Sequence, residues 1–398
     1  MPVANSVTEA LESASWIRRM FEEGLKLKAE FGADAVADVS LGNPVVEPPP
    51  EVVARLQELA VDPTPGTHRY MPNAGLGPTR QAVARHLASK TGVPYTEANV
   101  VMTVGAGGAL VALMRSILDV DDEVIILAPF FVEYLHYVIS FRGKTVVVET
   151  DDAFRPAAEA VAKAITPRTR AVIVNSPNNP TGVVYPAEDF AALGRVLEAA
   201  SEQHGRPIYL VSDEPYRALA YDGVEVPWPI HHYADTVHIT SFSKDLALPG
   251  ERIGYLALNP ASPHSGPLFH ALVYAMRALG FVNGPALQQR LVEPLLDVKV
   301  DVDAYADKRR RLLDALDAAG YDVVRPDGAF YVFPKVPDGE DDVAFVRRCV
   351  KERLLVVPGS GFGRAGHFRI SYAVTDATID LAVKALGAVA SVSGTSRP

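Results

Sequence analysis

Four short segments of the sequence carry side chains that could do chemistry, and each follows a run rich in β-branched residues. Residues 175–182 offer amides, residues 212–216 offer carboxylates and a phenol, and residues 240–244 offer hydroxyls and one amine. The fourth segment, residues 105–110, is rich in glycine and is typical of the start of a helix. Because ligands of open α/β sheets bind outside the carboxyl ends of the strands, we expect the four segments to meet at one site.

These groups match the needs of pyridoxal 5′-phosphate (PLP), a cofactor that works through an aldehyde and a pyridine ring. The aldehyde needs a lysine amine, and Lys244 offers one. The ring nitrogen must stay protonated if the ring is to accept electrons, which requires a buried carboxylate such as Asp213. Asn179 and Tyr216 are candidate donors to the phenolic oxygen of the ring. We therefore predict that Lys244, Asp213 and Tyr216 are the catalytic residues.

The glycine-rich segment could bind the phosphate of such a cofactor. Backbone N–H groups at a helix N-terminus bind anions, and a guanidinium adds a fixed cation. The candidates from this segment and from the segments around the lysine are Gly105, Ala106, Gly107, Ser241, Ser243 and Arg252. The same glycines could indicate a dinucleotide site, but the G-x-G-x-x-G pattern requires glycine where Leu110 stands.

A mostly parallel sheet would bring these segments together. Short apolar runs alternate with longer helical patterns at residues 100–104, 123–127, 145–148, 171–174, 208–211 and 237–239. Nearly continuous apolar runs are typical of strands buried on both faces. Alternating strands and helices predict a parallel sheet covered by helices. Residues 187–204 predict a helix that ends at a His-Gly C-cap, and residues 252–258 predict a further strand. The proline-rich residues 42–50 predict no regular structure.

After about residue 295 the pattern changes to that of an α+β unit. A charged amphipathic helix is predicted at residues 303–319, and strands are predicted at 321–324, 330–333, 355–357 and 367–372. We therefore predict an α/β protein with two domains. The large PLP-binding domain, residues 46–295, holds a mostly parallel sheet sandwiched by helices. A smaller α+β domain combines residues 1–45 with residues 296–398.

Several motifs resemble those of the class I/II aminotransferases, the aspartate aminotransferase-like family of fold-type I PLP enzymes. They are Ser241-Phe-Ser-Lys244 with Arg252, Asn175-Ser-Pro-Asn-Asn-Pro-Thr-Gly182, and Ser212-Asp-Glu-Pro-Tyr216. The spacing from Lys244 to Arg252 (252 − 244 = 8) is the family's spacing from the Schiff-base lysine to the phosphate-binding arginine. The resemblance extends over nearly the whole chain.

The resemblance implies further site residues. Phe131 would stack on the pyridine ring, and Tyr70 would reach the phosphate of the neighbouring subunit in a homodimer with shared active sites. Arg369 would bind the substrate α-carboxylate, helped by Asn179 and by the backbone near Gly42.

The resemblance also implies a reaction. It is a ping-pong transfer of an amino group from an L-amino acid to a 2-oxo acid, with Lys244 first holding PLP as a Schiff base and then acting as a base. A C–S or β-lyase or a decarboxylase of the same fold is the alternative, because no motif separates these reactions. Specificity stays open between aspartate-type and broad. Arg277 lies roughly where aspartate-specific members of the family place an arginine of the neighbouring subunit, and it could read an acidic side chain. Tyr134, Phe330 and Tyr331 could instead line an apolar pocket.

Charge and composition restrict the partners. Of the 398 residues, 48 are acidic and 38 are Lys or Arg, a formal net charge of −10 that repels nucleic acid and anionic membranes. The same charge disfavours a DNA-binding regulator built on this fold. No signal peptide and no apolar run of about 20 residues is present, so we expect a cytoplasmic protein. Cys349 cannot form an internal disulfide and should pack in a helix, and His231 and His232 lack further ligands for a metal.

Overall fold

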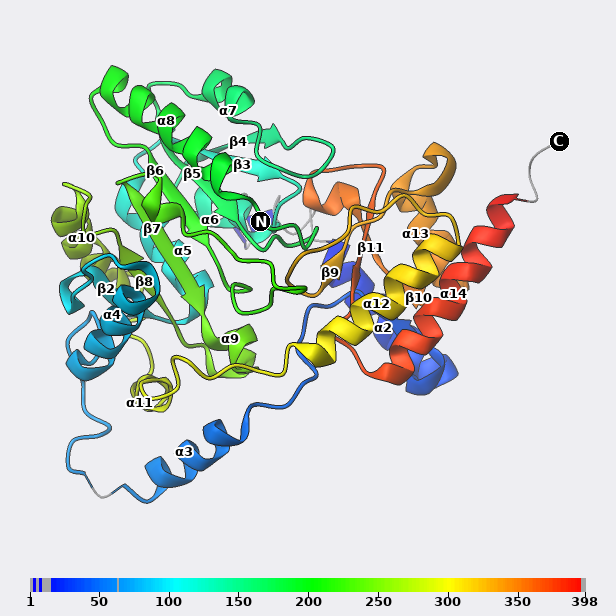
Figure 1. Ribbon diagram of the computed structural model, residues 1–398, viewed down its shortest axis with the longest axis horizontal. Helices are drawn as coiled ribbons and strands as arrows, with labels where there is room; N and C mark the ends of the chain where they lie inside the picture. Colours follow the sequence, from blue (N-terminus) through cyan, green and yellow to red (C-terminus); the bar gives the residue numbers. More distant parts are fainter. Residues whose placement is uncertain (1–2, 5–6, 9–15, 63, 395–398) are drawn as a thin grey trace.

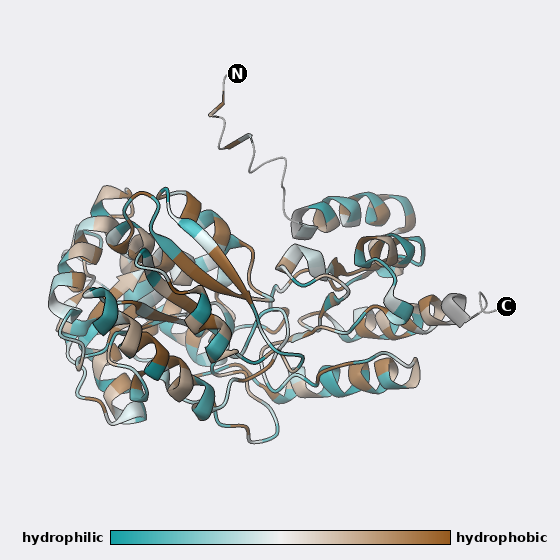
Figure 2. Cartoon of the chain, turned by 90° about the horizontal axis from the view of Figure 1, so that it is seen from above, coloured by the Kyte–Doolittle hydropathy of each residue, from teal (hydrophilic) through white to brown (hydrophobic). Residues whose placement is uncertain are grey.

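The computed structural model describes residues 3–4, 7–8, 16–62 and 64–394. The chain forms two lobes of unequal size that lie side by side (Figures 1 and 2). The larger lobe contains a seven-stranded sheet, and the smaller lobe contains short strands packed against long helices.

The seven-stranded sheet has the order β2-β8-β7-β6-β5-β3-β4. Its strands are β2 (Val100–Thr103), β3 (Glu123–Ala128), β4 (Lys144–Glu149), β5 (Thr169–Asn175), β6 (Tyr209–Asp213), β7 (Thr236–Ser241) and β8 (Gly254–Leu258). Strands β4, β3, β5, β6 and β7 are parallel, whereas β8 runs antiparallel to both β7 and β2. The mostly parallel sheet is confirmed, and the carboxyl ends of its parallel strands share one edge.

Each face of the sheet packs against its own apolar core, because successive side chains of a strand point to opposite faces. In β5, Val172 and Val174 join the core that continues into the smaller lobe, whereas Ala171 and Ile173 join the core on the opposite face. The strand β4 departs from the predicted burial on both faces. It lies at the edge of the sheet, and its Val147 is 47% exposed.

Helices flank both faces of this sheet (Figure 1). In the larger lobe they are α4 (Gly77–Thr91), α5 (Gly105–Ile117), α6 (Glu133–Ile139), α7 (Ala158–Ala164), α8 (Ala187–His204), α9 (Phe242–Asp245), α10 (Ser265–Ala278) and α11 (Ala286–Val292). The helix predicted at 187–204 is α8, and it ends at Gly205 with a φ of 64°. The left-handed conformation suits glycine, which has no Cβ to clash. Short 3-10 helices are η1 (Ala33–Ala35), η2 (Glu97–Asn99), η3 (Pro229–His231), η4 (Pro249–Glu251), η5 (Pro337–Gly339) and η6 (Gly359–Phe362).

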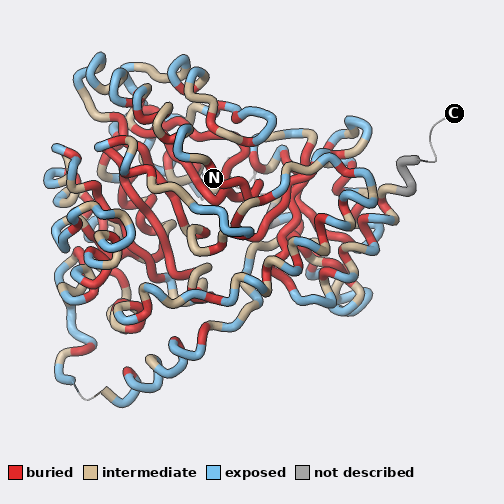
Figure 3. The backbone as a smooth tube through the Cα atoms, viewed as in Figure 1, coloured by how far each residue is buried: buried red, intermediate tan, exposed pale blue. Residues whose placement is uncertain are grey.

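The smaller lobe has two small sheets, β1-β10 and β11-β12-β9. Its strands are β1 (Ala37–Asp38), β9 (Tyr331–Val332), β10 (Leu354–Leu355), β11 (Val357–Pro358) and β12 (Phe368–Ser371). Its helices are α2 (Trp16–Phe31), α12 (Asp303–Ala318), α13 (Asp342–Lys351) and α14 (Asp376–Gly394). Buried residues concentrate along the strands of both lobes and on the inner faces of these helices (Figure 3). Cys349 is buried in α13 as a free thiol, as predicted.

Two predictions for this region need correction. Residues 321–324 form no strand; Lys335 N–H donates to Asp322 O (2.9 Å), while Tyr321 packs into the core. Val323 and Val324 are partly buried against the same core rather than paired in a sheet. The single strand predicted at 355–357 is divided between β10 and β11.

The proline-rich segment is irregular up to Pro49, and α3 (Pro50–Ala60) begins at the next residue. Proline suits the first position of a helix because its missing N–H has no partner there anyway. The domain boundaries at residues 45–46 and 295–296 stay a prediction, and residues 1–2, 5–6, 9–15 and 395–398 of the predicted small domain lie outside the described residues. No helix in the described part of the chain has the length and apolarity that a membrane span requires. The cytoplasmic location also stays a prediction.

Candidate active site

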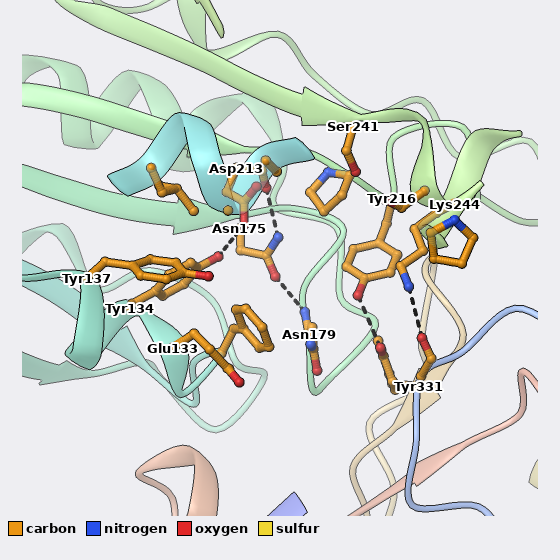
Figure 4. Close-up of a pocket in the computed structure, with 18 of the residues that line it drawn as sticks. Glu133, Tyr134, Tyr137, Asn175, Asn179, Asp213, Tyr216, Ser241, Lys244 and Tyr331 are labelled. Atoms are coloured by element: carbon orange, nitrogen blue, oxygen red, sulfur yellow. Dashed lines mark hydrogen bonds between the residues drawn. The ribbon is translucent and has the colours of Figure 1, made fainter. Parts of the chain in front are cut away.

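A pocket of about 320 Å³ lies at the carboxyl ends of β5, β6 and β7 (Figure 4). It brings together most residues that the sequence singled out. Those on its wall are Gly42, Ala106, Gly107, Phe131, Asn179, Asp213, Tyr216, Ser241, Ser243, Lys244, Arg252 and Arg369. The parallel strands explain this convergence, because their ends align even though the residues come from distant parts of the sequence.

Lys244 lies in α9, the short helix that follows β7. Its Nζ donates a hydrogen bond to Gly42 O (2.9 Å) and lies 5.3 Å from the centre of the Phe330 ring. Burial lowers the pKa of this amine to about 8, and the guanidinium groups of Arg252 and Arg369 act in the same direction. The amine can therefore lose its proton near neutral pH, as a nucleophile or a base must.

Asp213 is the last residue of β6, and its carboxylate is only half satisfied. Tyr134 Oη donates to Asp213 Oδ2 (2.6 Å), whereas Oδ1 is buried and accepts no hydrogen bond from any described residue. Burial raises the pKa of Asp213 to about 7, although the Tyr134 hydroxyl acts in the opposite direction. An acceptor left without a partner in a pocket calls for a cationic or N–H group of a ligand.

The neighbouring carboxylate, Glu214, behaves differently. Arg217 and His238 pair with it, and His238 Nδ1 lies 3.1 Å from Glu214 Oε1. Burial raises the pKa of Glu214, but these two partners outweigh burial and bring it down to about 2. Glu214 therefore stays ionised as part of the core, and Asp213 is the carboxylate available to a ligand.

A chain of amides connects Asp213 to Arg369. Asn175 Nδ2 donates to Asp213 O (2.7 Å), and Asn179 N–H donates to Asn175 Oδ1 (2.7 Å). Arg369 Nη1 then donates to Asn179 Oδ1 (3.0 Å), and its Nη2 donates to Ser40 O (2.5 Å). Arg369 is 2% exposed, and its Nε is among the buried atoms that have no partner within the described residues. Its charge is thus positioned by neutral groups and is available to an anionic ligand.

The glycine-rich segment begins α5 and lies against Arg252. Gly105 has a φ of 66°, and a Cβ on it would lie 3.0 Å from Arg252 Nη2. Glycine at this position lets the guanidinium approach the N-terminus of α5, where unpaired backbone N–H groups attract anions. Ser241 ends β7 beside the same wall. These groups together form a cradle with the chemistry of a phosphate site.

Of the aromatic residues nominated for the site, some line the pocket and others do not. Phe131 lines the pocket, whereas Phe130 is buried and its N–H donates to Phe362 O (3.0 Å). Tyr216 lines the pocket and its Oη lies 3.1 Å from Tyr331 Oη. Tyr70 is not brought to this pocket; it is 94% exposed and lies beside a separate cavity that Phe281 also lines.

Helix α6 closes one wall of the pocket, and the sequence nominated only its Tyr134, as a candidate for lining an apolar substrate pocket. In α6, Glu133, Tyr134 and Tyr137 all line the pocket. Residues one turn apart share a helix face, so the spacing of Glu133 and Tyr137 could have nominated them once the end of β3 was placed at the site. Tyr331 was also missed as a partner of Tyr216, because the bond joins residues from two lobes. Among the described residues, no group of three His, Cys, Asp or Glu is arranged to hold a metal ion.

Comparison with known proteins agrees with this geometry. The family model for aminotransferase class I and II matches residues 35–386. The aspartate/prephenate aminotransferase of Thermus thermophilus is 34% identical over 376 residues, which cover 91% of this chain and 92% of the relative. The aromatic-amino-acid aminotransferase 2 of Thermococcus litoralis is 32% identical over 372 residues, which cover 90% of this chain and 91% of the relative.

Solved structures give the same answer. The crystal structure of an aminotransferase from Eubacterium rectale superposes with a TM-score of 0.94 at 36% identity, covering 99% of this chain and 100% of the other. The chain therefore belongs to the class I and II aminotransferase family, whose members depend on PLP and exchange an amino group between amino acids and 2-oxo acids, and it is an aminotransferase.

Proposed function

We propose that this aminotransferase binds PLP covalently through Lys244 and converts an L-amino acid into a 2-oxo acid in a ping-pong sequence. One observation carries the proposal: the pocket holds both a buried amine with a lowered pKa and a buried carboxylate oxygen, Asp213 Oδ1, without a partner among the described residues. A protonated pyridine nitrogen is the donor that this oxygen lacks. The cradle at Gly105 and Arg252 supports the proposal, since it suits the phosphate.

The residues on the pocket wall, together with Gly105 beside Arg252, have the chemistry that the cofactor needs. We propose that the ring and phosphate contacts are made by Gly105, Ala106, Gly107, Phe131, Asn179, Asp213, Tyr216, Ser241, Ser243 and Arg252. When bound, PLP supplies an aldehyde that reacts with amines and a ring that accepts the electron pair left behind when a proton leaves the substrate's α-carbon.

Lys244 would be the base of the reaction. Its pKa of about 8 allows the amine to take a proton from the substrate's α-carbon and to return one near neutral pH. Asp213, when ionised, would hold the proton on the ring nitrogen. Tyr216 would donate from its hydroxyl, with Tyr331 fixing the orientation of that hydroxyl (3.1 Å).

Arg369 would bind the substrate's α-carboxylate. A planar guanidinium can make two parallel hydrogen bonds to a carboxylate, and the bonds from Arg369 to Asn179 and Ser40 already fix its plane. The carbonyl of Gly42, which accepts from Lys244 Nζ, lies at the same end of the pocket. Its position suits a loop that covers the substrate.

We further propose a homodimer in which Tyr70 completes the partner's site. A tyrosine that is 94% exposed on a folded chain is typical of a surface that binds a partner. Sedimentation should give twice the chain mass of 42.8 kDa, and Tyr70→Phe should weaken the affinity for PLP without dissociating the dimer. A fully active monomer would contradict this part of the proposal.

A half-reaction tests the function. The purified PLP-loaded enzyme is mixed with single amino acids and no acceptor, and the absorbance of the cofactor is followed. Conversion of the lysine-bound form to the pyridoxamine form, with one 2-oxo acid released per site, is expected. Release of ammonia or carbon dioxide instead would favour the β-lyase or decarboxylase alternative.

A further inference from the structure

Glu133 is a carboxylate on the pocket wall that none of the roles above uses. It begins α6, and its Oε2 is buried and accepts no hydrogen bond from the described residues. Figure 4 shows Glu133 on the same wall as Tyr134 and Tyr137, across the pocket from Lys244 and Tyr331. An unsatisfied acceptor at this point is available to a ligand rather than to the fold.

The helix explains why this carboxylate faces the pocket. Glu133 and Tyr137 are one turn apart and therefore share a face of α6. Tyr137 Oη reaches the start of α5, since a Cβ on Gly107 would lie 3.1 Å from it. Burial raises the pKa of Glu133, whereas a hydrogen bond from its own backbone N–H and the charges of His136 and Arg369 act in the opposite direction. The Glu133 carboxylate is therefore close enough to Arg369 for the two charges to interact.

The cations on the described wall of the pocket are Lys244, Arg252 and Arg369. Under the proposed function all three are already engaged, since the first holds the cofactor's aldehyde, the second its phosphate, and the third the substrate's α-carboxylate. Arg277 is exposed on α10 and does not line the pocket of its own chain, so it could read a substrate only in the site of a neighbouring subunit. A second carboxylate on the substrate would therefore find Glu133 and no further cation of this chain among the residues that form the wall.

We propose that Glu133 is a specificity residue that selects amino donors whose side chain ends in an N–H group and disfavours donors with a second carboxylate. This inference rests on the proposed function. An N–H group of the substrate could donate to Glu133 Oε2. Without such a donor this oxygen has lost its hydrogen bonds to water and gained none in return from the described part of the chain, which is unfavourable. A carboxylate in the same place would meet a like charge.

Pairs of donors that differ only in the end group provide the test. Half-reaction rates are measured for glutamine against glutamate and for asparagine against aspartate, with the PLP-loaded wild-type enzyme and Glu133→Gln. The amides should react on the order of tenfold faster or more than their acids in the wild type. In Glu133→Gln the ratio of the amide rate to the acid rate should fall on the order of tenfold. The side-chain amide at position 133 of this variant can donate a hydrogen bond to a substrate carboxylate, which Glu133 cannot do.

A matched control and a binding measurement separate this role from a structural one. Glu159→Gln makes the same chemical change at an exposed position of α7 and should leave the ratio unchanged. Calorimetry with the unreactive ligands succinamate and succinate should give the same preference for the amide, and the same loss of preference in Glu133→Gln, without any turnover.

The outcomes are distinguishable. If acids react as fast as their amides in the wild type, or if Glu133→Gln leaves the ratio unchanged, the role of Glu133 is overturned while the aminotransferase proposal stands. If no donor converts the cofactor, the proposed function fails, and the ratio of succinamate to succinate binding still decides whether Glu133 selects an N–H group.

Discussion

Replacing Asp213 with asparagine should stabilise the cofactor-free protein at neutral and alkaline pH. Burial raises the pKa of this carboxyl from its ordinary 3.8 to about 7. Between these values the folded protein keeps the proton that the unfolded chain releases. The stability that Asp213 contributes is therefore complete below about pH 4 and is lost as the pH rises through about 7. At about 1.4 kcal/mol per pKa unit, the loss amounts to about 4 kcal/mol.

Asparagine isolates this effect because it has nearly the shape of aspartate and does not titrate. Its Oδ1 can still accept the hydroxyl of Tyr134, which now lies 2.6 Å from Asp213 Oδ2. The assay is urea unfolding of the cofactor-free wild type and Asp213→Asn from pH 5 to pH 8. The free energy of unfolding of the wild type minus that of the variant should fall by about 2 kcal/mol between pH 5 and 7.

A control and a refuting result complete the test. Asp34→Asn, an exposed position in η1, should give a difference that does not change across this pH range. If the free-energy difference between wild type and Asp213→Asn does not change with pH, the pKa of Asp213 is not raised. If the difference increases with pH, the pKa of Asp213 is lowered instead. With PLP bound the order of stability should invert, because the cofactor gives Asp213 Oδ1 the partner that the described residues do not provide.

Three further substitutions probe the same pocket. Lys244→Ala should abolish turnover in steady-state assays while PLP still binds; measurable turnover would end the assignment of the base. Arg369→Ala should chiefly raise KM for every donor and lower kcat/KM roughly a hundredfold, because it removes two hydrogen bonds to a charged group; unchanged kinetics would remove its role. Tyr134→Phe should move the acid limb of the kcat/KM pH profile up by about one unit or more, because Asp213 loses its donor, whereas Tyr95→Phe, which removes a buried hydroxyl without a partner in the described chain, should not move it.

Much of the site could be predicted because strand ends align. Asn179 and Lys244 follow parallel strands and Asp213 ends one, and the topology of such a sheet places those ends at one edge. Sequence order and residue type were then enough to nominate them. Arg369 could be nominated only through resemblance to a family, because it lies in the smaller lobe and reaches the pocket across the interface between lobes.

The misses have physical reasons. Glu133 and Tyr137 lie in a helix of seven residues, too short for a clear periodic signal. Residues 321–324 have strand composition but no neighbouring strand, and pairing depends on tertiary structure that composition does not encode. Tyr70 lies outside the pocket of its own chain, so its role depends on a second copy.

Chemical trapping would show whether Lys244 is the lysine that holds the cofactor. The PLP-loaded enzyme is reduced with borohydride, digested, and analysed by mass spectrometry. We expect one modified peptide, with a phosphopyridoxyl group on Lys244, and no such peptide from Lys244→Ala. A modification on another lysine, or an unmodified Lys244 in a protein that carries stoichiometric PLP, would show that Lys244 does not hold the cofactor.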